Sequence, residues 1–387
     1  MKILFVMDRM HLNELNGYSI NAKRIMESLL EKGIEVHAIC HGKNEKIKVH
    51  ELSHHYLYKK VFTFPIASIL LVKKLNKVFA EEKFDAVIAK PLISTTEGFW
   101  NKLPGIPLND SIFYSALRKK CAEQNAKLFY LIDGITEKNS FAGMLVGSTK
   151  QNHLNQLKKS NGIITLSNVQ KNLLQQMNVK NNFFVLPASV DIKTFRQKPA
   201  KFEGINTNDL NLLYLSSSCD EKDLQPLLKI MKNSNKKIKL FISGEKNNQI
   251  AQLINDFNLG ERIAFLGKIS DEKIPELINA VDIGVYLKKF NSPIGDASTM
   301  VKVSEYLACG KPALFPEMSG VIEQTGDAGI VLDKGSAIVL NSFAFNKKLL
   351  EDFSVNARKQ AEAKLDLNKN TECLKEFIEG VVYGKQV

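Results

Sequence analysis

Apolar runs and amphipathic stretches alternate along this chain. Residues 3–7 form an apolar run that predicts a buried strand, residues 19–32 have the spacing of an amphipathic helix, and residues 35–40 form the next run. Further strands are predicted at residues 86–89, 128–132, 162–166 and 183–186. Strands that alternate with helices predict an α/β fold built on a parallel sheet.

A polar, strand-poor stretch at residues 190–210 interrupts this alternation, and we interpret it as a linker. The alternation then restarts, with strands predicted at residues 212–215, 239–242, 263–266, 283–286, 312–315 and 330–332. Helices are predicted at residues 224–232, 248–257, 274–280 and 300–309, and residues 345–383 are predicted to be wholly helical. This order predicts two doubly wound domains in tandem with a cleft between them.

The charge of the chain is concentrated in its first half. The 387 residues have a formal net charge of +12, and residues 1–200 contain 29 Lys and Arg against 16 Asp and Glu, whereas the remainder is almost balanced. A basic half predicts a polyanionic neighbour such as membrane lipid, nucleic acid or a phosphorylated substrate, and the alternative is a lysine content that only serves solubility. No nucleic-acid recognition module is recognisable, so nucleic acid is not the partner that we expect.

Cysteine usage and hydropathy indicate a cytoplasmic protein. The five cysteines are odd in number and widely spaced, which fits a reducing compartment, and no apolar stretch approaches the roughly 20 residues that span a bilayer. Residues 59–77 combine lysines with apolar and aromatic residues. This segment predicts either contact with an anionic membrane surface, which would place the protein on the inner face of the membrane, or an ordinary amphipathic helix.

Residues 298–312 are the most informative stretch of the chain. Ser298 and Thr299 can cap a helix that Gly310 ends, and Lys302 and Glu305 are three residues apart and share one face of it. A polar helix N-terminus that follows a strand is where α/β proteins hold anionic ligands. The sequence has no GxGxxG, no Walker A loop and no Asp-x-Asp, so we expect no cofactor and no metal.

Five local segments, in this order along the chain, carry a family resemblance: Gly17 in the first βα loop and residues 164–167, 185–195, 265–268 and 302–312. With these segments the chain resembles the retaining group-1 glycosyltransferases. The resemblance implies the GT-B fold, in which two Rossmann-like, doubly wound domains face a central cleft. It further implies an acceptor-binding domain at residues 1–195, a donor-binding domain at residues 196–369, and a C-terminal helix at about 370–387 that packs back on the first domain.

The resemblance also implies an activity. The chain would transfer a sugar from a nucleotide diphosphate-sugar to a hydroxyl of a glycan or lipid-linked acceptor, with retention and without a metal, in the synthesis of bacterial surface polysaccharides or glycoconjugates. Asp133 and Lys302 are the implied catalytic residues, with Glu137 close to the first. The implied donor-binding residues are Gly17, Ser216, Lys222, Gly267, Lys268, Ser298, Thr299, Lys302 and Glu305.

Chemistry supports some of these roles and offers a plainer alternative for each. The Glu305 carboxylate can accept two hydrogen bonds from a ribose diol, and the Lys302 ammonium can offset the charge of a departing diphosphate. Alternatively the two residues form only a helical ion pair. The family often has a glutamate at the position of Ala297 and an arginine after the first strand of the second domain, and both are missing. A GT-B sugar-nucleotide epimerase and a non-catalytic GT-B-like binding subunit therefore stay open as alternatives.

Overall fold

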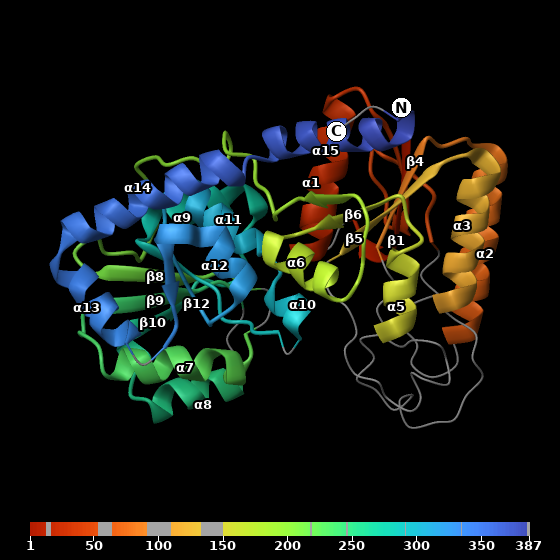
Figure 1. The fold of residues 1–387 in the computed structure, drawn as a ribbon. Coiled ribbons are helices and arrows are strands. Elements are labelled where there is room, and N and C mark those ends of the chain that lie inside the picture. Colours follow the sequence, from red (N-terminus) through yellow and green to blue (C-terminus); the bar gives the residue numbers. More distant parts are fainter. Residues whose placement is uncertain are drawn as a thin grey trace. The chain divides into compact units, whose positions relative to one another are not determined.

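The computed structural model describes residues 1–12, 17–52, 64–90, 110–132, 150–216, 219–244, 247–290, 292–333 and 335–384. Its contacts divide the chain into two compact units (Figure 1). Unit 1 consists of residues 1–186, 292–295 and 368–387, and unit 2 of residues 187–291 and 296–367. No helix of the described segments is both long and apolar enough to cross a membrane.

Unit 1 is built on a parallel sheet of seven strands in the order β3-β2-β1-β4-β5-β6-β7. The strands are β1 Lys2–His11, β2 Glu35–His41, β3 Lys48–Val49, β4 Ala86–Ala89, β5 Lys127–Ile132, β6 Gly162–Thr165 and β7 Phe183–Val185. Its helices are α1 Gly17–Glu31, α2 Phe64–Glu81, α3 Asp110–Gln124, α5 Lys150–Leu157, α6 Asn168–Gln176 and α15 Leu367–Tyr383. The apolar runs in the sequence become strands because a parallel sheet is covered on both faces. Every position of β4 and β6 is buried, whereas the edge strands β3 and β7 are partly exposed.

Helix α15 packs on unit 1 although it lies at the end of the chain. The ring of Phe377 stacks on Phe184 with a centroid distance of 5.3 Å and meets Phe129 edge-on at 5.7 Å. The buried hydroxyls of Ser28 in α1 and Thr371 in α15 are 2.6 Å apart and share a hydrogen bond. These contacts tie the last helix to the sheet and to α1.

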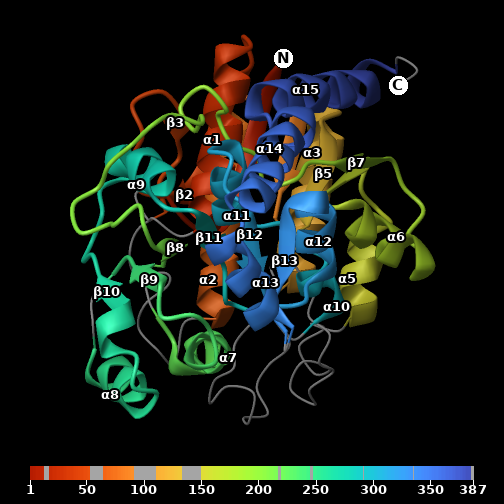
Figure 2. The ribbon, with the colours of Figure 1, turned by 90° about the vertical axis from the view of Figure 1, so that its left-hand side faces the viewer.

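Unit 2 is built on a parallel sheet of six strands in the order β10-β9-β8-β11-β12-β13, which Figure 2 shows from one end. The strands are β8 Leu210–Tyr214, β9 Ile238–Ile242, β10 Ile263–Phe265, β11 Ile283–Val285, β12 Ala313–Phe315 and β13 Gly329–Val331. The helices are α7 Glu221–Lys232, α8 Asn248–Asp256, α9 Ile274–Ala280, α10 Pro293–Asp296, α11 Val301–Ala308, α12 Ser319–Thr325, α13 Ser336–Phe345 and α14 Lys347–Lys364. Residues 293–295 of α10 belong to unit 1.

Helices cover both faces of this second sheet. Figure 1 shows α9, α11 and α12 on one face and α7 and α8 on the other, and each group packs on its own buried apolar cluster. The strand order reverses between β8 and β11. From β8 the chain adds β9 and β10 on one side of the sheet, and it then adds β11, β12 and β13 on the other side. Ligands of open α/β sheets bind at such a switch point, beyond the carboxyl ends of the strands.

Two sequence expectations need adjustment. Residues 345–383 are not one helix, because Leu365 and Asp366 separate α14 from α15. At this break Val190 donates its N–H to the Leu365 carbonyl at 2.9 Å and accepts the Leu367 N–H at 3.0 Å. Val190 therefore pairs with unit 2, and the units divide after residues 186 and 367, whereas the sequence suggested 195 and 369.

The described part of α2 is an ordinary core helix. Leu71, Leu75 and Val78 are buried in the apolar cluster of unit 1, while Lys73 and Lys77 are exposed on the opposite side. This spacing is that of an amphipathic helix whose apolar face is already covered by its own domain. Residues 59–63 lie outside the described residues.

Helix α11 rests on the sheet through Tyr306. Its ring lies against Gly284 in the middle of β11, where a Cβ atom would come within 2.1 Å of the ring. Its hydroxyl reaches the junction of β8 and β11, where it accepts the Leu215 N–H at 3.1 Å. The carbonyl oxygens of Leu213 and Val285 are each 3.2 Å from the same hydroxyl, so one residue joins both strands to α11.

We expect Gly284→Ala to destabilise the protein by about 2–3 kcal/mol, because the added methyl group overpacks against the buried Tyr306 ring. Gly260→Ala is the matched control, since a Cβ there comes no closer than 4.0 Å to any atom. Urea unfolding of both variants measures the difference. Equal unfolding midpoints for the two variants would show that the ring contact is not tight.

Candidate functional site

The loops after β8, β9 and β10 are bound to one another at the carboxyl edge of the unit 2 sheet. Ser216 follows β8 and donates its N–H to the Ser243 hydroxyl at 3.0 Å. Gly244, which follows Ser243 after β9, donates its N–H to the carbonyl of Gly267 at 2.7 Å. The three loops thus form one continuous rim, and sequence reasoning found Ser216 and Gly267 of this rim but not Ser243.

Gly267 has the backbone conformation that favours glycine, with a φ of +67°, and no atom lies within 4 Å of the place where a Cβ would stand. The main chain at Gly267 is therefore open to the close approach of a flat group. Lys268 follows and is exposed. The predicted contact of these two residues with a nucleobase stays a prediction, but the rim leaves room for it.

The N-terminus of α11 is held by α12 instead of by its own cap. The N-cap residue is Met300, and no side chain caps the helix, so the expected capping by Ser298 and Thr299 is wrong. Gln324 of α12 accepts the Met300 N–H at 2.8 Å and donates to the Met300 carbonyl at 2.9 Å. The helix end is thus fixed, and the side chain of its N-cap residue makes no hydrogen bond to the first-turn N–H groups.

The hydroxyl of Thr299 is buried and accepts the Ala188 N–H at 2.7 Å. Ala188 is also bound from α11, because its carbonyl accepts the hydroxyl of Ser304. Ser298 is buried as well, with 3% of its surface exposed. Burial and this packing role explain why neither hydroxyl serves as the helix cap.

Lys302 and Glu305 form the ion pair that their spacing allows. The Lys302 ammonium lies 3.1 Å from a carboxylate oxygen of Glu305, whose side chain is only 1% exposed. A carboxylate at this depth is stable only when it is paired or hydrogen-bonded. The ion-pair alternative is therefore realised in this structure, and Lys302, with 22% exposure, is the more accessible of the two.

The position of the missing first glutamate is closed by packing. Ala297 is fully buried, and the backbone of Gly320 lies so close to it that a Cβ on the glycine would come within 2.3 Å. The neighbouring Asp296 is also occupied, because its carboxylate accepts the N–H and the hydroxyl of Ser319 at 3.0 and 2.9 Å. Asp296 thus caps α12, and neither residue offers a second carboxylate beside α11.

The other predicted residues lie apart from this group along the sequence. Gly17 is the exposed first residue of α1 in unit 1. Lys222 is exposed in the first turn of α7 in unit 2, where Asp220 caps the helix. Asp133 and Glu137 lie outside the described residues, so their roles stay predictions.

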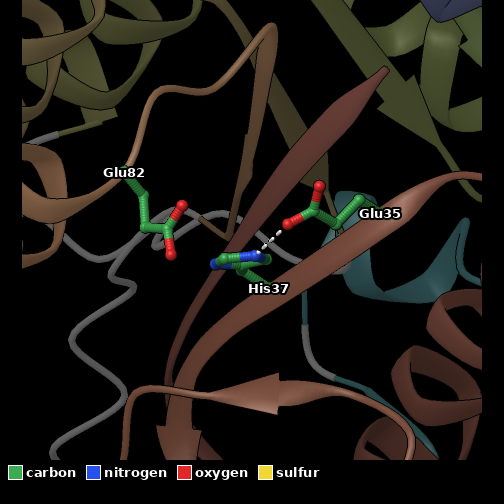
Figure 3. A group of neighbouring side chains, drawn as sticks. All are labelled: Glu35, His37 and Glu82. Carbon is green, nitrogen blue, oxygen red and sulfur yellow. Dashed lines mark hydrogen bonds and ion pairs between the residues drawn. The ribbon is translucent and has the colours of Figure 1, made fainter.

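Unit 1 contains a separate group of polar side chains at the amino edge of its sheet, which we call the amino-edge cluster (Figure 3). It consists of Glu35, His37 and Glu82, whose ligand atoms lie within 4.8 Å of one another and could hold a metal ion. Lys2, however, is 2.8 Å from both carboxylates, and Lys48 also pairs with Glu82. This cluster is therefore already balanced in charge, and a divalent cation would have to displace the Lys2 ammonium.

A sequence pattern near this cluster was missed. His50, Glu51 and His54 follow the order His-Glu-x-x-His, which binds zinc when one face of a helix carries it. Here His50 is extended, because its N–H donates to the Ala38 carbonyl of β2 at 2.7 Å. The described part of the pattern is not helical, and His54 lies outside the described residues.

Comparison with known proteins relates the second half of the chain to a glycosyltransferase family. Residues 195–360 match the family model described as glycosyl transferases group 1. Sucrose-phosphate synthase from Thermosynechococcus elongatus is similar over 99% of both chains, with a TM-score of 0.74 and 13% identity. HepE from Anabaena, solved in complex with UDP, covers 98% of this chain and 100% of its own, with a TM-score of 0.71 and 17% identity.

WaaG, a glycosyltransferase involved in lipopolysaccharide biosynthesis, is similar over 98% of this chain and 100% of its own, with a TM-score of 0.65 and 15% identity. No curated protein sequence matches. The two parallel sheets and these neighbours define an α/β protein with the GT-B fold. The group 1 glycosyltransferase match covers residues 195–360, and together with the GT-B fold it supports an enzyme that transfers a sugar from a nucleotide sugar.

His50, whose ring nitrogen lies 3.1 Å from a ring nitrogen of His37 in the amino-edge cluster, predicts a loss of stability in mild acid. Burial, followed by the nearby His37, lowers the pKa of His50 from 6.5 to about 4. The unfolded chain binds the proton more readily, so this contribution is complete above pH 6.5 and is lost as the pH falls toward 4. We expect the free energy of unfolding to fall by about 1–2 kcal/mol, because solvent screens part of the effect at the half-exposed ring.

Urea unfolding between pH 7.5 and 4.5 measures this loss, and His50→Gln should show a smaller decrease than the unchanged protein. The carboxylate of Glu82 titrates in a lower window, because hydrogen bonds from Lys2 and then Lys48 lower its pKa from 4.5 to about 2. The same decrease in both proteins above pH 4.5 would assign the pH dependence to other groups.

Proposed function

We propose that the chain transfers a sugar from a nucleoside diphosphate-sugar to a hydroxyl of a glycan or lipid-linked acceptor. We further propose that the reaction proceeds with retention and without a metal, in the synthesis of surface polysaccharides or glycoconjugates. The observation that carries the proposal is the N-terminus of α11, which has no side-chain cap and presents Lys302 and Glu305 within its first turns. The group 1 match of the same region supports it.

The diphosphate would lie at the first turn of α11. Helix N-termini bind phosphate because their N–H groups lack partners and the helix dipole is positive there. Departure of the nucleoside diphosphate develops negative charge, which the Lys302 ammonium would offset in a fixed position. HepE, one of the neighbours of known structure, is described with UDP and with UDP-glucose, which supports a donor of this kind.

The nucleoside would extend from the diphosphate toward the rim. Glu305 would accept hydrogen bonds from the ribose hydroxyls, since a carboxylate offers two oxygens. The Lys302 ammonium, now paired with Glu305, would turn toward the diphosphate when the donor binds. Gly267 and Lys268 would receive the base along the open main chain of the rim. We propose Gly17 near the donor phosphates and Asp133 as a catalytic residue.

A binding panel tests the donor site. The unchanged protein should be stabilised in a thermal-shift assay by at least one of UDP, GDP and ADP. Glu305→Ala should then raise the donor KM about 10–100-fold and lower turnover, because hydrogen bonds to a charged group are each worth about 1.5–3 kcal/mol. Glu351→Ala, a change of an exposed glutamate on α14, is the matched control.

Unchanged donor affinity in an active Glu305→Ala enzyme would remove the ribose role, and binding of no nucleoside diphosphate would favour the non-catalytic subunit. The epimerase alternative has its own signature. An epimerase converts the nucleotide sugar when no acceptor is present, whereas a transferase needs the acceptor for product formation. Product analysis with the donor alone separates the two.

We also propose a peripheral membrane location on the cytoplasmic face, where a lipid-linked acceptor would be found. The excess of basic residues in the first half supports this, and Lys73 and Lys77 are exposed on α2. Attraction of this kind is electrostatic and is screened by salt. We therefore expect co-sedimentation with vesicles containing anionic lipid at low salt, a loss of binding at 0.5 M salt, and little binding to neutral vesicles. Equal recovery with neutral and anionic vesicles would contradict the proposal.

A further inference from the structure

The helix that follows β8 is unsuited to hold a diphosphate, although it begins at the carboxyl edge of the unit 2 sheet. Asp220 caps α7, and its carboxylate accepts the Lys222 N–H at 2.8 Å. Glu221 and Asp223 add two further acidic residues to the first turn. The N-terminus of α7 is thus supplied with negative charge by its own side chains, which repel a second anion.

The half-buried Asp223 strengthens this conclusion. Burial raises the pKa of its carboxyl group, and the neighbouring Asp220 raises it further, while Lys288 acts in the opposite direction. Lys288 follows β11 in the sequence and belongs to a different loop. Lys288, whose charge acts on Asp223, thus comes from the other side of the switch point, beyond β11.

Lys288 lies just beyond the end of β11, the strand to which the Tyr306 hydroxyl of α11 is hydrogen-bonded. The last residue of β11 is Val285, whose carbonyl is 3.2 Å from the Tyr306 hydroxyl of α11. Tyr286 donates its N–H to the Leu314 carbonyl of the next strand at 2.9 Å, and Leu287 is buried. Lys288, the next residue, is exposed and lies at the carboxyl edge of the sheet.

The loop that carries Lys288 is fixed against the same core as the start of α11. The Lys288 ammonium lies 5.8 Å from the centre of the Phe290 ring. Phe290 and Met300, the N-cap residue of α11, both pack on the apolar cluster that contains Tyr306. Lys302 lies four residues before Tyr306, one helical turn nearer the carboxyl edge. Lys288 and Lys302 therefore both lie at the carboxyl edge of the unit 2 sheet. Lys288 follows β11 and Lys302 is on α11, and Tyr306 joins these two elements.

We infer that Lys288 is a second cation for the donor diphosphate and acts together with Lys302 at the β8–β11 switch point. This inference rests on the proposed function. A diphosphate carries more charge than one ammonium and one helix terminus neutralise. The first turn of α7, where Lys222 stands among Asp220, Glu221 and Asp223, has no net positive charge to supply the remainder. Lys288 is exposed and can reach a bound anion without a change in the core.

A simpler role for Lys288 would be to offset Asp223 alone. The two roles predict different effects on ligand binding when the Lys288 ammonium is removed, depending on how many phosphate groups the ligand carries. An ammonium that binds diphosphate affects UDP more than UMP and leaves uridine unchanged. An ammonium that only offsets Asp223 affects the three ligands alike, or affects stability without affecting binding.

The test is the binding of UDP, UMP and uridine to the full chain, measured by calorimetry for the unchanged protein, Lys288→Met and Lys289→Met. GDP and ADP, each with its monophosphate and nucleoside, are measured in the same way. Lys289 is the adjacent exposed lysine and provides the matched control. We expect Lys288→Met to weaken diphosphate binding about tenfold or more, and Lys289→Met to stay within about twofold. Thermal unfolding verifies that both variants fold.

The outcomes separate this inference from the proposed function. Diphosphate binding by the unchanged protein together with equal affinities of the two variants would overturn the role of Lys288 and leave the donor site in place. An equal loss for UDP, UMP and uridine would also overturn it. Failure of the unchanged protein to bind any of the three nucleoside diphosphates would overturn the proposed function and this inference with it.

Discussion

Unit 2 of this protein depends on the hydroxyl of Tyr306. A buried hydroxyl must be hydrogen-bonded, and this one finds its partners only at the point where β8 and β11 run side by side. It accepts one N–H and has two carbonyl oxygens within reach of its single proton. Because Gly284 leaves room for the ring, α11 lies directly on the strand pair at which the strand order reverses. This contact fixes the position of α11 on the sheet.

Both ends of α11 are then fixed by other helices. Arg358 of α14 donates to the carbonyl of Ala308, the last residue of α11, at 2.6 Å, which places a positive charge at the negative end of the helix. At the other end, Gln324 of α12 binds the N–H and the carbonyl of Met300. Backbone N–H groups held in this way need no rearrangement to meet an anion, and such preorganisation is what makes them effective.

Local patterns predicted the framework of this structure well. The expected α/β fold is confirmed, because apolar runs bounded by polar residues have few alternatives to buried parallel strands. Gly310 ends α11 as expected, with a φ of +69°. The errors arise where a distant residue takes the place of a local one. Met300 is capped through Gln324 instead of by Ser298 or Thr299, and Val190 breaks the C-terminal helix by pairing at Leu365 and Leu367. No local signal could reveal these partners, since they lie 24 and more than 170 residues away.

The distribution of charge explains why these distant contacts matter for function. The excess of basic residues lies in the first half, whereas residues 201–387 are almost balanced and even carry an acidic turn at α7. An anion is therefore not attracted to unit 2 by its net charge. It can be held only where a few positive groups are fixed at short range, because fields at a protein surface fall off within about 10 Å in salt. Tyr306, Gln324 and Arg358 fix the helix that carries Lys302, and so they determine where its short-range positive charge stands.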